Sequence, residues 1–361
     1  MSDYYYLNYE KAFKFCKNYF MSIGVPENGS ETIADVLTTS DLMGIESHGL
    51  QRMIMYHGGV KSGRIKPSAE PVIEKETPIS AVVNAGDGFG HIAGKMAMQL
   101  AIDKAKEHGI GMTVVNNSTH YGIAGYYSMM AAKQGLLGFS MTNTEALVVP
   151  TFGRTAMIGT NPIAVTMPAK PYPLHIDMAT STVPAGKIEV YNKLGKACPE
   201  GWILNAEGKV TTNPQEFIDI RANKTDGGLL PLGGAGELMG GHKGYALGVL
   251  VELMTAILSG GLTSYYVRRE RTVEKCCHWF MAVDYSMFGN KEEIEEHMSQ
   301  FMQELRDSRK ADGQERIYTH GEKELSRLDS IKANGLKASS KTYEELLLIA
   351  REANLDASLL G

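Results

Sequence analysis

The stretch Ile79-Ser80-Ala81-Val82-Val83-Asn84-Ala85, followed by Gly86-Asp87-Gly88-Phe89-Gly90, decides the fold class of this chain. The first seven residues predict a strand, and the closely spaced glycines after them predict a loop. Working outward, we expect a helix over residues 94–107, a strand over 111–115, a helix over 126–134, and strands over 138–143 and 279–284. Strands that alternate with helices in this way are typical of an α/β core.

Further helices are expected before and after these core segments in the chain. Residues 8–42 are predicted to be helical, with a turn at residues 26–30 and Ser30 as the cap of the second helix. A further helix is predicted from Ser47 to Val60, another after Gly244, and a charged one from Lys291 onward. The glutamates at the start of that last segment are typical of a helix face in contact with water.

Composition limits the classes of protein that the chain can belong to. It has 361 residues, of which 43% are hydrophobic and 21% charged, so it can bury a sizeable core divided into subdomains. The formal net charge is -5 and no basic stripe is present, so nucleic acid is not expected as a partner. A small anionic substrate would have to be attracted by local positive groups.

Neither a membrane span nor a metal centre is expected. The longest apolar stretch, residues 246–258, is interrupted by Glu252 and is too short to cross a bilayer, so a buried helix is predicted there. The N-terminus lacks the basic region and apolar core of a signal peptide. The four cysteines show no CxxC spacing, which predicts reduced thiols and a cytoplasmic protein.

Four short polar motifs carry the candidate chemistry. They are Ser47-His48-Gly49-Leu50-Gln51-Arg52, Ser118-Thr119-His120-Tyr121-Gly122, Ile176-Asp177-Met178-Ala179-Thr180-Ser181 and Gly241-His242-Lys243-Gly244-Tyr245. In a helix, His48 and Arg52 would share one face and could reach the same small ligand. Arginine matches a carboxylate, and histidine exchanges a proton near neutral pH. The pair therefore suits a 2-keto or 2-hydroxy acid, with a surface histidine and arginine as the alternative.

The other motifs leave more than one interpretation open. His120 follows a predicted strand, where it could be an acid–base residue or a structural, hydrogen-bonded histidine. Asp177 could orient a histidine, bind a ribose hydroxyl or cap a helix. The segment Gly240–Gly244 could bind an anion at a helix N-terminus or form a flexible turn. The glycines of residues 86–90 do not have the Rossmann spacing, and a P-loop is also absent.

In this order, the motifs resemble the malate/L-lactate dehydrogenase family of non-Rossmann, NAD(P)-dependent 2-hydroxy acid oxidoreductases, which includes malate, lactate, sulfolactate and ureidoglycolate dehydrogenases. The resemblance covers nearly the whole chain and extends to Thr142-Asn143-Thr144, Gly159-Thr160-Asn161-Pro162, Pro199-Glu200-Gly201-Trp202 and Gly321-Glu322. It implies a homodimer with an α/β, non-Rossmann mixed-sheet cofactor domain and a helical domain built from both terminal segments. The expected division is residues 1–75 (helical), 76–288 (cofactor core) and 289–361 (helical).

The resemblance also implies roles for individual residues. His48 would be the leading proton donor and acceptor, oriented by Asp177, and His120 would be the rival acid–base residue beside the nicotinamide. Ser47, Arg52 and Thr160 would bind the substrate. The implied cofactor-binding residues are His120, Thr142, Asn143, Thr144, Asp177, Met178, Ala179, Thr180, Ser181, His242, Lys243, Gly244, His320, Gly321 and Glu322. The implied reaction interconverts malate and oxaloacetate with NAD or NADP.

Other functions remain open from the sequence. Within the family, the substrate could be lactate, sulfolactate, ureidoglycolate or a cyclic imino acid. Outside it, Lys243 could form a Schiff base with pyridoxal phosphate. A non-catalytic assembly module is a third possibility, against which the combination of His48, Arg52, His120 and Asp177 argues.

Overall fold

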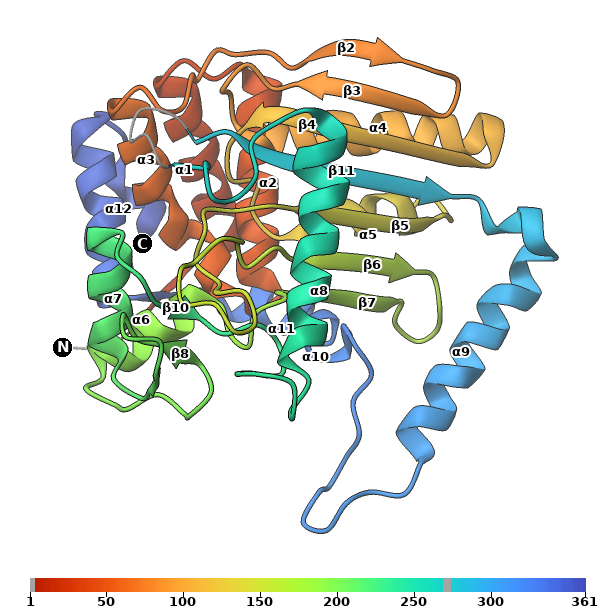
Figure 1. Ribbon diagram of the computed structural model, residues 1–361. Helices are drawn as coiled ribbons and strands as arrows, with labels where there is room; N and C mark the ends of the chain where they lie inside the picture. The colour runs from red at the N-terminus through yellow and green to blue at the C-terminus, as the bar shows by residue number, and fades with distance from the viewer. Residues whose placement is uncertain (1–3, 269–273) are drawn as a thin grey trace.

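A seven-stranded mixed sheet forms the centre of the computed structural model, which describes residues 4–268 and 274–361 (Figure 1). Its strands lie in the order β2-β3-β4-β11-β5-β6-β7. They are β2 (Val72–Glu76), β3 (Ser80–Asn84), β4 (Ile110–Ser118), β5 (Leu137–Thr142), β6 (Ile163–Met167), β7 (Leu174–Met178) and β11 (Cys276–Val283). In this sheet β3 and β4 pair in parallel and the other neighbours pair antiparallel. The predicted α/β class is confirmed.

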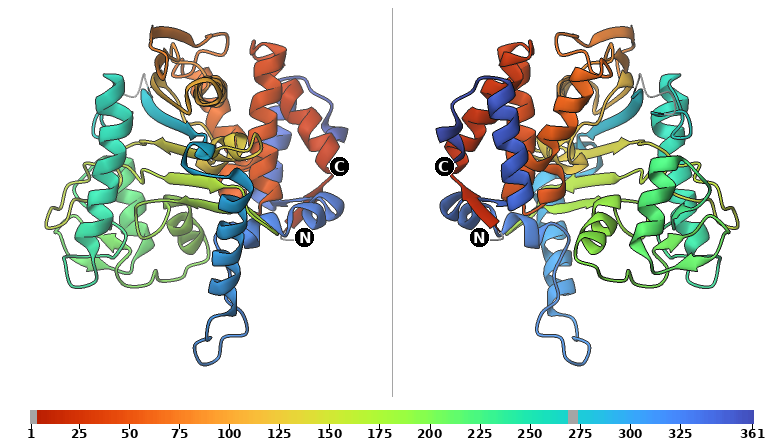
Figure 2. Two further views of the ribbon diagram at one scale, coloured as in Figure 1. Left: turned by 90° about the vertical axis from the view of Figure 1, so that its right-hand side faces the viewer. Right: turned by 90° about the vertical axis from the view of Figure 1, so that its left-hand side faces the viewer.

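Helices cover both faces of the sheet. On one face α4 (Gly90–His108) and α5 (Ala124–Ala132) pack around Phe280 of β11. On the other face lies α8 (Gly241–Glu252), whose Val251 packs against Trp279 (Figure 2). Because side chains alternate along a strand, the adjacent residues Trp279 and Phe280 serve two separate cores. A π-helical turn, Leu253–Ile257, continues α8.

The two terminal segments form one helical body beside the sheet. It contains α1 (Tyr9–Ser22), α2 (Glu27–Leu42), α3 (Met53–Lys61) and α12 (Ser340–Glu352), which share one buried core. The strands β1 (Tyr4–Leu7) and β12 (Leu336–Ser339) pair antiparallel and join the two ends of the chain. The expected helical domain built from both termini is confirmed. Its exact boundaries stay a prediction, and β2 crosses the one placed at residue 75.

A third, smaller unit follows β7 in the chain. It contains α6 (Ala185–Lys193), α7 (Pro214–Asn223) and a sheet of β8 (Ile203–Leu204), β9 (Val210–Thr211) and β10 (Gly228–Leu229). Its core is built around Ile188, Phe217 and Leu229. The sequence indicated only turns over part of this segment, because strands of two residues carry no periodic signal. The unit matters for the site because α6 and α7 contribute Gly186, Glu189 and Arg221 to the wall of a cavity.

Two local predictions were wrong. Ser30 does not cap the second helix: α2 begins after Pro26, and the Ser30 hydroxyl donates to the carbonyl of Val25. The segment from Ser47 is not one helix, because two 3-10 turns, Glu46–His48 and Leu50–Arg52, precede α3. Gly49 separates these turns with a non-helical backbone (ψ -147°), and a Cβ there would lie 1.9 Å from the Asp41 carboxylate, so only glycine fits at this position.

The last part of the chain leaves the body and returns to it. Helix α9 (Lys291–Asp307) projects from the sheet, and the following segment leads back to α10 (Glu322–Leu325) and α11 (Leu328–Asn334) (Figure 1). Met302 is the one buried side chain of α9, in agreement with the predicted solvated helix. None of the helices in residues 4–268 and 274–361 has the length and apolar composition needed to cross a membrane.

Candidate active site

One cavity collects most of the residues that the sequence singled out. It lies where the helical body, the ends of β4 and β5, and the small unit meet, and its free volume is ≈ 120 Å³. A cavity of this size has room for a small organic acid. The predicted site residues that line it are Ser47, His48, Arg52, His120, Thr142, Asn143, Thr144 and Thr160.

His48 and His120 form a stacked pair in this cavity. Their ring centroids are 5.5 Å apart, with an angle of 27° between the rings. His120 follows the end of β4, as predicted, and His48 ends the first 3-10 turn. The second turn, which carries Arg52, is held by the buried Asp41 carboxylate, which accepts a hydrogen bond of 2.8 Å from the Leu50 N–H. His48 and Arg52 thus reach one cavity from two successive turns.

Three contacts fix the orientation of His120. Its Nδ1 lies 2.7 Å from the Tyr56 hydroxyl and accepts a longer hydrogen bond, 3.3 Å, from the Gly122 N–H. Its backbone N–H donates to Glu274 at 3.0 Å. Since a backbone N–H can only donate, we assign the proton of neutral His120 to Nε2. Tyr56 also lies 3.1 Å from Nε2 of the buried His91.

Both histidines are neutral in this structure. Burial, with the charge of Arg52 as a second cause, lowers the pKa of His48 from its usual 6.5 to about 3. Burial also lowers the pKa of His120 well below its usual value, with His48 and Arg52 contributing. Neutral imidazoles can accept a proton from an alcohol, as oxidation of a hydroxy acid requires.

Arg52 is held by the backbone and keeps part of its fork free. Its Nε donates to the carbonyl of Ser47 at 2.5 Å. Within residues 4–268 and 274–361 no carboxylate pairs with its guanidinium, and burial lowers the pKa of this group. A buried guanidinium without a counter-ion strongly favours an anionic ligand.

The threonine and asparagine side chains of the cavity are tied to the sheet. The Thr142 hydroxyl lies 2.7 Å from His278 Nδ1, and Asn143 donates to the carbonyl of Leu262 at 2.9 Å. Thr144 accepts a hydrogen bond of 3.1 Å from the Thr160 N–H. These contacts link the end of β5 to β11, to the segment before β11 and to the segment before β6, so they make this wall of the cavity rigid.

Asp177 does not lie beside His48. Its carboxylate accepts a hydrogen bond of 2.7 Å from the Gly125 N–H at the start of α5, and it lines a separate cavity with Met178, His320 and Gly321. Burial raises the pKa of Asp177 to about 6, Gly125 opposes that shift, and Glu324 adds to it. The structure therefore gives no support to the idea that Asp177 orients His48, because three strands, β11, β5 and β6, separate β7 from β4.

The remaining cofactor candidates fall into two further groups. Thr180 and Ser181 lie beside α8: the Thr180 carbonyl accepts a 2.9 Å bond from the Leu232 N–H, and α8 packs closely on that turn at Gly244. His242 has a buried Nδ1 without a partner among the described residues, whereas Lys243 is exposed. The carboxylate of Glu322 is engaged by Arg316 and by the Thr319 N–H, so it holds its own loop.

These groups fit an extended nicotinamide dinucleotide in part. Residues 177–181 run from the cavity that His320 lines toward the N-terminus of α8. On the way, the Thr180 N–H donates to the carbonyl of Thr160 at 2.9 Å, and Thr160 lines the histidine cavity. The orphaned Nδ1 of His242 would meet a polar group there. Ala179 is a small residue on this path and adds no bulk that would exclude a ligand.

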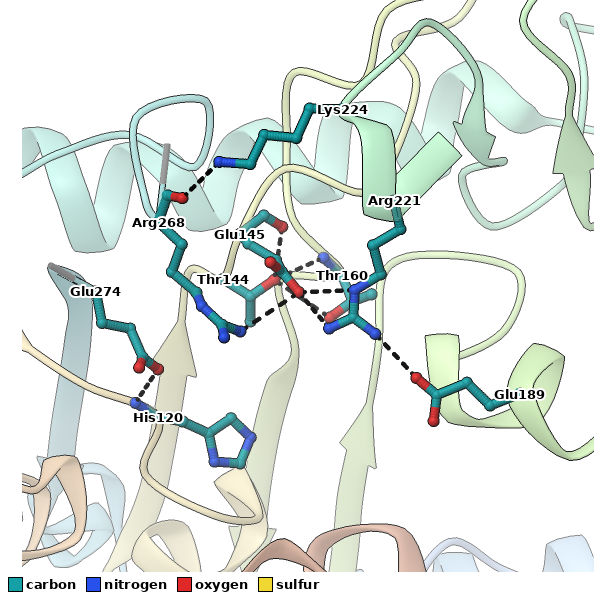
Figure 3. Close-up of polar contacts among 9 residues, drawn as sticks. All are labelled: His120, Thr144, Glu145, Thr160, Glu189, Arg221, Lys224, Arg268 and Glu274. Atoms are coloured by element: carbon teal, nitrogen blue, oxygen red, sulfur yellow. Dashed lines mark hydrogen bonds and ion pairs between the residues drawn. The ribbon is translucent and has the colours of Figure 1, made fainter. Parts of the chain in front are cut away.

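Sequence reasoning missed a set of charged residues in the cavity wall. They are Glu145, Glu189, Arg221, Arg268 and Glu274 (Figure 3). The two arginines and Glu145 form ion pairs across segments that are far apart in the chain. No motif marks them, because isolated charges in loops and on short helices are usually solvent-exposed. Tyr56 of α3 was also missed, because a buried tyrosine in an apolar helix is usually only a core residue.

Two neutral histidines beside an arginine that lacks a counter-ion define a site for moving a proton to or from a small anion. A model of the malate/L-lactate dehydrogenase family matches residues 7–347. The malate dehydrogenase of Pyrococcus horikoshii is 44% identical over 96% of this chain and 95% of the relative. The L-sulfolactate dehydrogenase of Methanothermobacter thermautotrophicus is 34% identical over 97% of this chain and 98% of the relative.

A solved structure agrees with these sequence matches. The crystal structure of malate dehydrogenase from Entamoeba histolytica has a TM-score of 0.94 and 34% identity, over 98% of this chain and 99% of that chain. The chain belongs to the malate/L-lactate dehydrogenase family. It is a dehydrogenase that acts on a CH–OH group, and membership implies a nicotinamide cofactor.

The alternatives from other classes are therefore wrong. Lys243, considered for a Schiff base with pyridoxal phosphate, is exposed and does not line the histidine cavity. A Schiff-base lysine needs an enclosed site that lowers its pKa. The interpretation as a non-catalytic assembly module is wrong, because the family match and the relatives identify a dehydrogenase.

Proposed function

We propose that this protein interconverts malate and oxaloacetate with NAD or NADP. The observation that carries the proposal is the buried guanidinium of Arg52 beside the stacked His48 and His120. A 2-hydroxy acid presents a carboxylate next to the carbon that is oxidised, so one arginine and one histidine can hold both groups. The relatives named malate dehydrogenase support malate over lactate, sulfolactate, ureidoglycolate or a cyclic imino acid.

The protein's part in this reaction is positioning and proton transfer. Arg52, with Ser47 and Thr160 nearby, would bind the carboxylate on C1 and turn C2 toward the cofactor side of the cavity. His48 would take the hydroxyl proton during oxidation and return it during reduction, and the Nε2–H of His120 would donate to the same oxygen. When bound, the cofactor supplies hydride transfer.

We propose the cofactor site along the path from the histidine cavity to α8. Thr142, Asn143 and Thr144 would lie at the nicotinamide end with His120. The remaining residues of the proposed site are Asp177, Met178, Ala179, Thr180, Ser181, His242, Lys243, Gly244, His320 and Gly321. Glu322 would act indirectly, because its carboxylate holds the loop that carries His320.

The test is nicotinamide absorbance during reduction of oxaloacetate and of pyruvate, with NADH and NADPH in parallel. Fast oxidation of one reduced cofactor by oxaloacetate supports the proposal and identifies the cofactor. Tight binding of reduced cofactor without turnover of any 2-keto acid would contradict the substrate and direct attention to cyclic imines.

Substitution of Arg52 by alanine is expected to weaken substrate binding more than it slows turnover. Removing one partner of a buried ion pair costs about 2–5 kcal/mol, which corresponds to a rise in KM of about 30-fold or more. Steady-state kinetics at saturating cofactor measure the change. Arg52→Lys is the control, because it keeps the positive charge and loses the two-pronged guanidinium. Its KM should lie between those of wild type and Arg52→Ala. An unchanged KM in Arg52→Ala would refute the carboxylate-binding role.

We also propose that the protein is a cytoplasmic homodimer. Helix α8 and its continuation expose an apolar stripe at helical spacing: Val249, Leu253 and Ile257, with Leu250 and Leu258 beside them. A contiguous apolar face of this kind usually marks an interface between proteins.

Mass measurement by light scattering tests the homodimer. The protein is expected at twice 39.4 kDa, the mass of one chain. The variant Leu253→Glu should shift it toward the monomer, because an unpaired charge would be buried in the interface. The substitution Leu305→Glu, at an exposed position of α9, is the control. A wild-type monomer at micromolar concentration would contradict the proposal.

A further inference from the structure

The cavity carries two arginines besides Arg52, and they differ in how fully they are paired. Arg221 of α7 donates through Nε and Nη2 to Glu145 and through Nη1 to Glu189 at 2.9 Å. Each edge of its fork is therefore engaged. Figure 3 shows Arg221 between the two glutamates, with Arg268 approaching Glu145 from the opposite side.

Arg268 is the less satisfied of the two. Its Nη1 lies 3.6 Å from Glu145, which is too long for a hydrogen bond. In the described part of the chain no other carboxylate lies within 4 Å of its guanidinium, although Glu274 adds a weaker attraction, and Glu145 is already shared with Arg221. The side chain is 24% exposed and lines the same cavity as His120 and Arg52. Arg268 thus presents hydrogen-bond donors and an incompletely neutralised charge to the substrate space.

The backbone on which Arg268 sits is anchored. Its carbonyl accepts a hydrogen bond of 2.9 Å from Lys224 Nζ, and its N–H donates to the Glu274 carbonyl at 3.3 Å. Four residues earlier, the Ser264 N–H donates to the buried carboxylate of Glu252 at 3.1 Å. Such supports hold a binding group in place before the ligand arrives, which lowers the entropic cost of binding.

We infer that Arg268 binds the second acid group of the substrate. This inference rests on the proposed function: Arg52 takes the carboxylate on C1, and Arg268 takes a carboxylate or sulfonate at the far end of a 2-hydroxy acid. A dianionic substrate then meets one cation at each end. A monocarboxylate such as lactate, or a cyclic imino acid, leaves Arg268 without a ligand. Arg268 thereby makes the cavity selective for dianionic acids.

Electrostatics supports this choice. Three arginines and three glutamates, Arg52, Arg221, Arg268, Glu145, Glu189 and Glu274, line the cavity. Without a bound anion, two of the three cations lack a hydrogen-bonded carboxylate in residues 4–268 and 274–361. Two acid groups on one small molecule would satisfy both, in a cavity where partial burial strengthens the attraction.

The experiment compares kcat/KM for oxaloacetate and pyruvate in wild type, Arg268→Met and Arg268→Lys. Wild type is expected to prefer oxaloacetate strongly. Arg268→Met should lower kcat/KM for oxaloacetate on the order of 100-fold and leave that for pyruvate nearly unchanged. Arg268→Lys should give an intermediate ratio. Arg154→Met, which removes an exposed arginine paired with Asp226 outside the cavity, is the matched control and should behave as wild type.

Several outcomes would overturn the inference. Equal losses of kcat/KM for both substrates would make Arg268 a structural residue. A wild type that does not prefer oxaloacetate would show that no residue of the cavity recognises the second acid group. A raised KM for the cofactor with an unchanged substrate ratio would assign Arg268 to the cofactor. Absence of any 2-keto acid reduction in wild type would instead refute the proposed function itself. Thermal unfolding of each variant checks that it is folded.

Discussion

Replacement of His48 by alanine is expected to lower kcat by about 100- to 10,000-fold while cofactor binding is retained. An acid–base residue must accept and release a proton without a clash in either state. His48 Nδ1 lies 2.9 Å from the Ser47 hydroxyl, which can donate or accept. His120 Nδ1 instead faces the Gly122 N–H, which can only donate, so protonation there opposes that donor. The geometry therefore favours His48 for proton exchange and His120 as a fixed donor.

Parallel variants separate these two roles. His120→Asn keeps a side-chain N–H donor and should retain more activity than His120→Ala, whereas His48→Asn should be as inactive as His48→Ala. The pH profile of kcat is a second measurement. The charge of Arg52 is one cause of the low pKa of His48, and a bound carboxylate offsets that charge. In the complex, the acid limb of the pH profile, which we assign to His48, should therefore lie above pH 3. Normal turnover in His48→Ala would refute the assignment.

A steep loss of stability in acid is the second large effect that we expect. The pKa values of His48, His91 and His278 are lowered to about 3, that of His175 to about 4, and that of His120 well below 6.5, in each case first by burial. The unfolded chain binds these protons near pH 6.5 and the folded chain does not. Stability is therefore complete above pH 6.5 and falls as the pH drops toward the folded pKa values.

Buried carboxyl groups oppose this trend in part. Burial raises the pKa of Asp41 well above its usual value and that of Asp177 to about 6, so both favour the folded state as the pH falls. The five histidines bind protons mainly in the unfolded state and the two carboxyl groups mainly in the folded state. The unfolded state therefore binds about three protons more than the folded state. This corresponds to about 4 kcal/mol per pH unit between pH 6 and 4. Because native proteins typically have only about 5–15 kcal/mol of stability, the protein should unfold before pH 4.

Urea unfolding from pH 8 to pH 4, followed by circular dichroism, measures this dependence. His91→Asn should flatten the slope by about one proton, because the His91 Nδ1 is buried without a partner in the described structure. His297→Asn, at an exposed position of α9, should leave the slope unchanged. A free energy of unfolding that stays constant between pH 6.5 and 5 would contradict the expectation.

Residues close together in the chain were predicted well. The strands β3, β4 and β5 and the helices α4 and α5 lie where the alternation of segments indicated. His120 follows a strand, and Gly241–Glu252 forms a helix preceded by glycines, as expected. The helix predicted from Ser47 was wrong because Gly49 has a non-helical backbone and the next residue, Leu50, donates its N–H to the Asp41 carboxylate. That constraint comes from a neighbouring helix and leaves no mark in the local sequence.

By itself, the sequence determined the α/β class, the order of the core elements and the motif with His48 and Arg52. These features depend on local periodicity, turn residues and spacing. Only the tertiary structure decided the sheet order, in which β11 lies between β4 and β5, and the composition of the cavity wall. Glu274 accepts a hydrogen bond from His120, which is 154 positions away in the chain, and Arg221 donates to Glu145, which is 76 positions away. Such pairs depend on how packed layers meet, and no spacing in the chain encodes that.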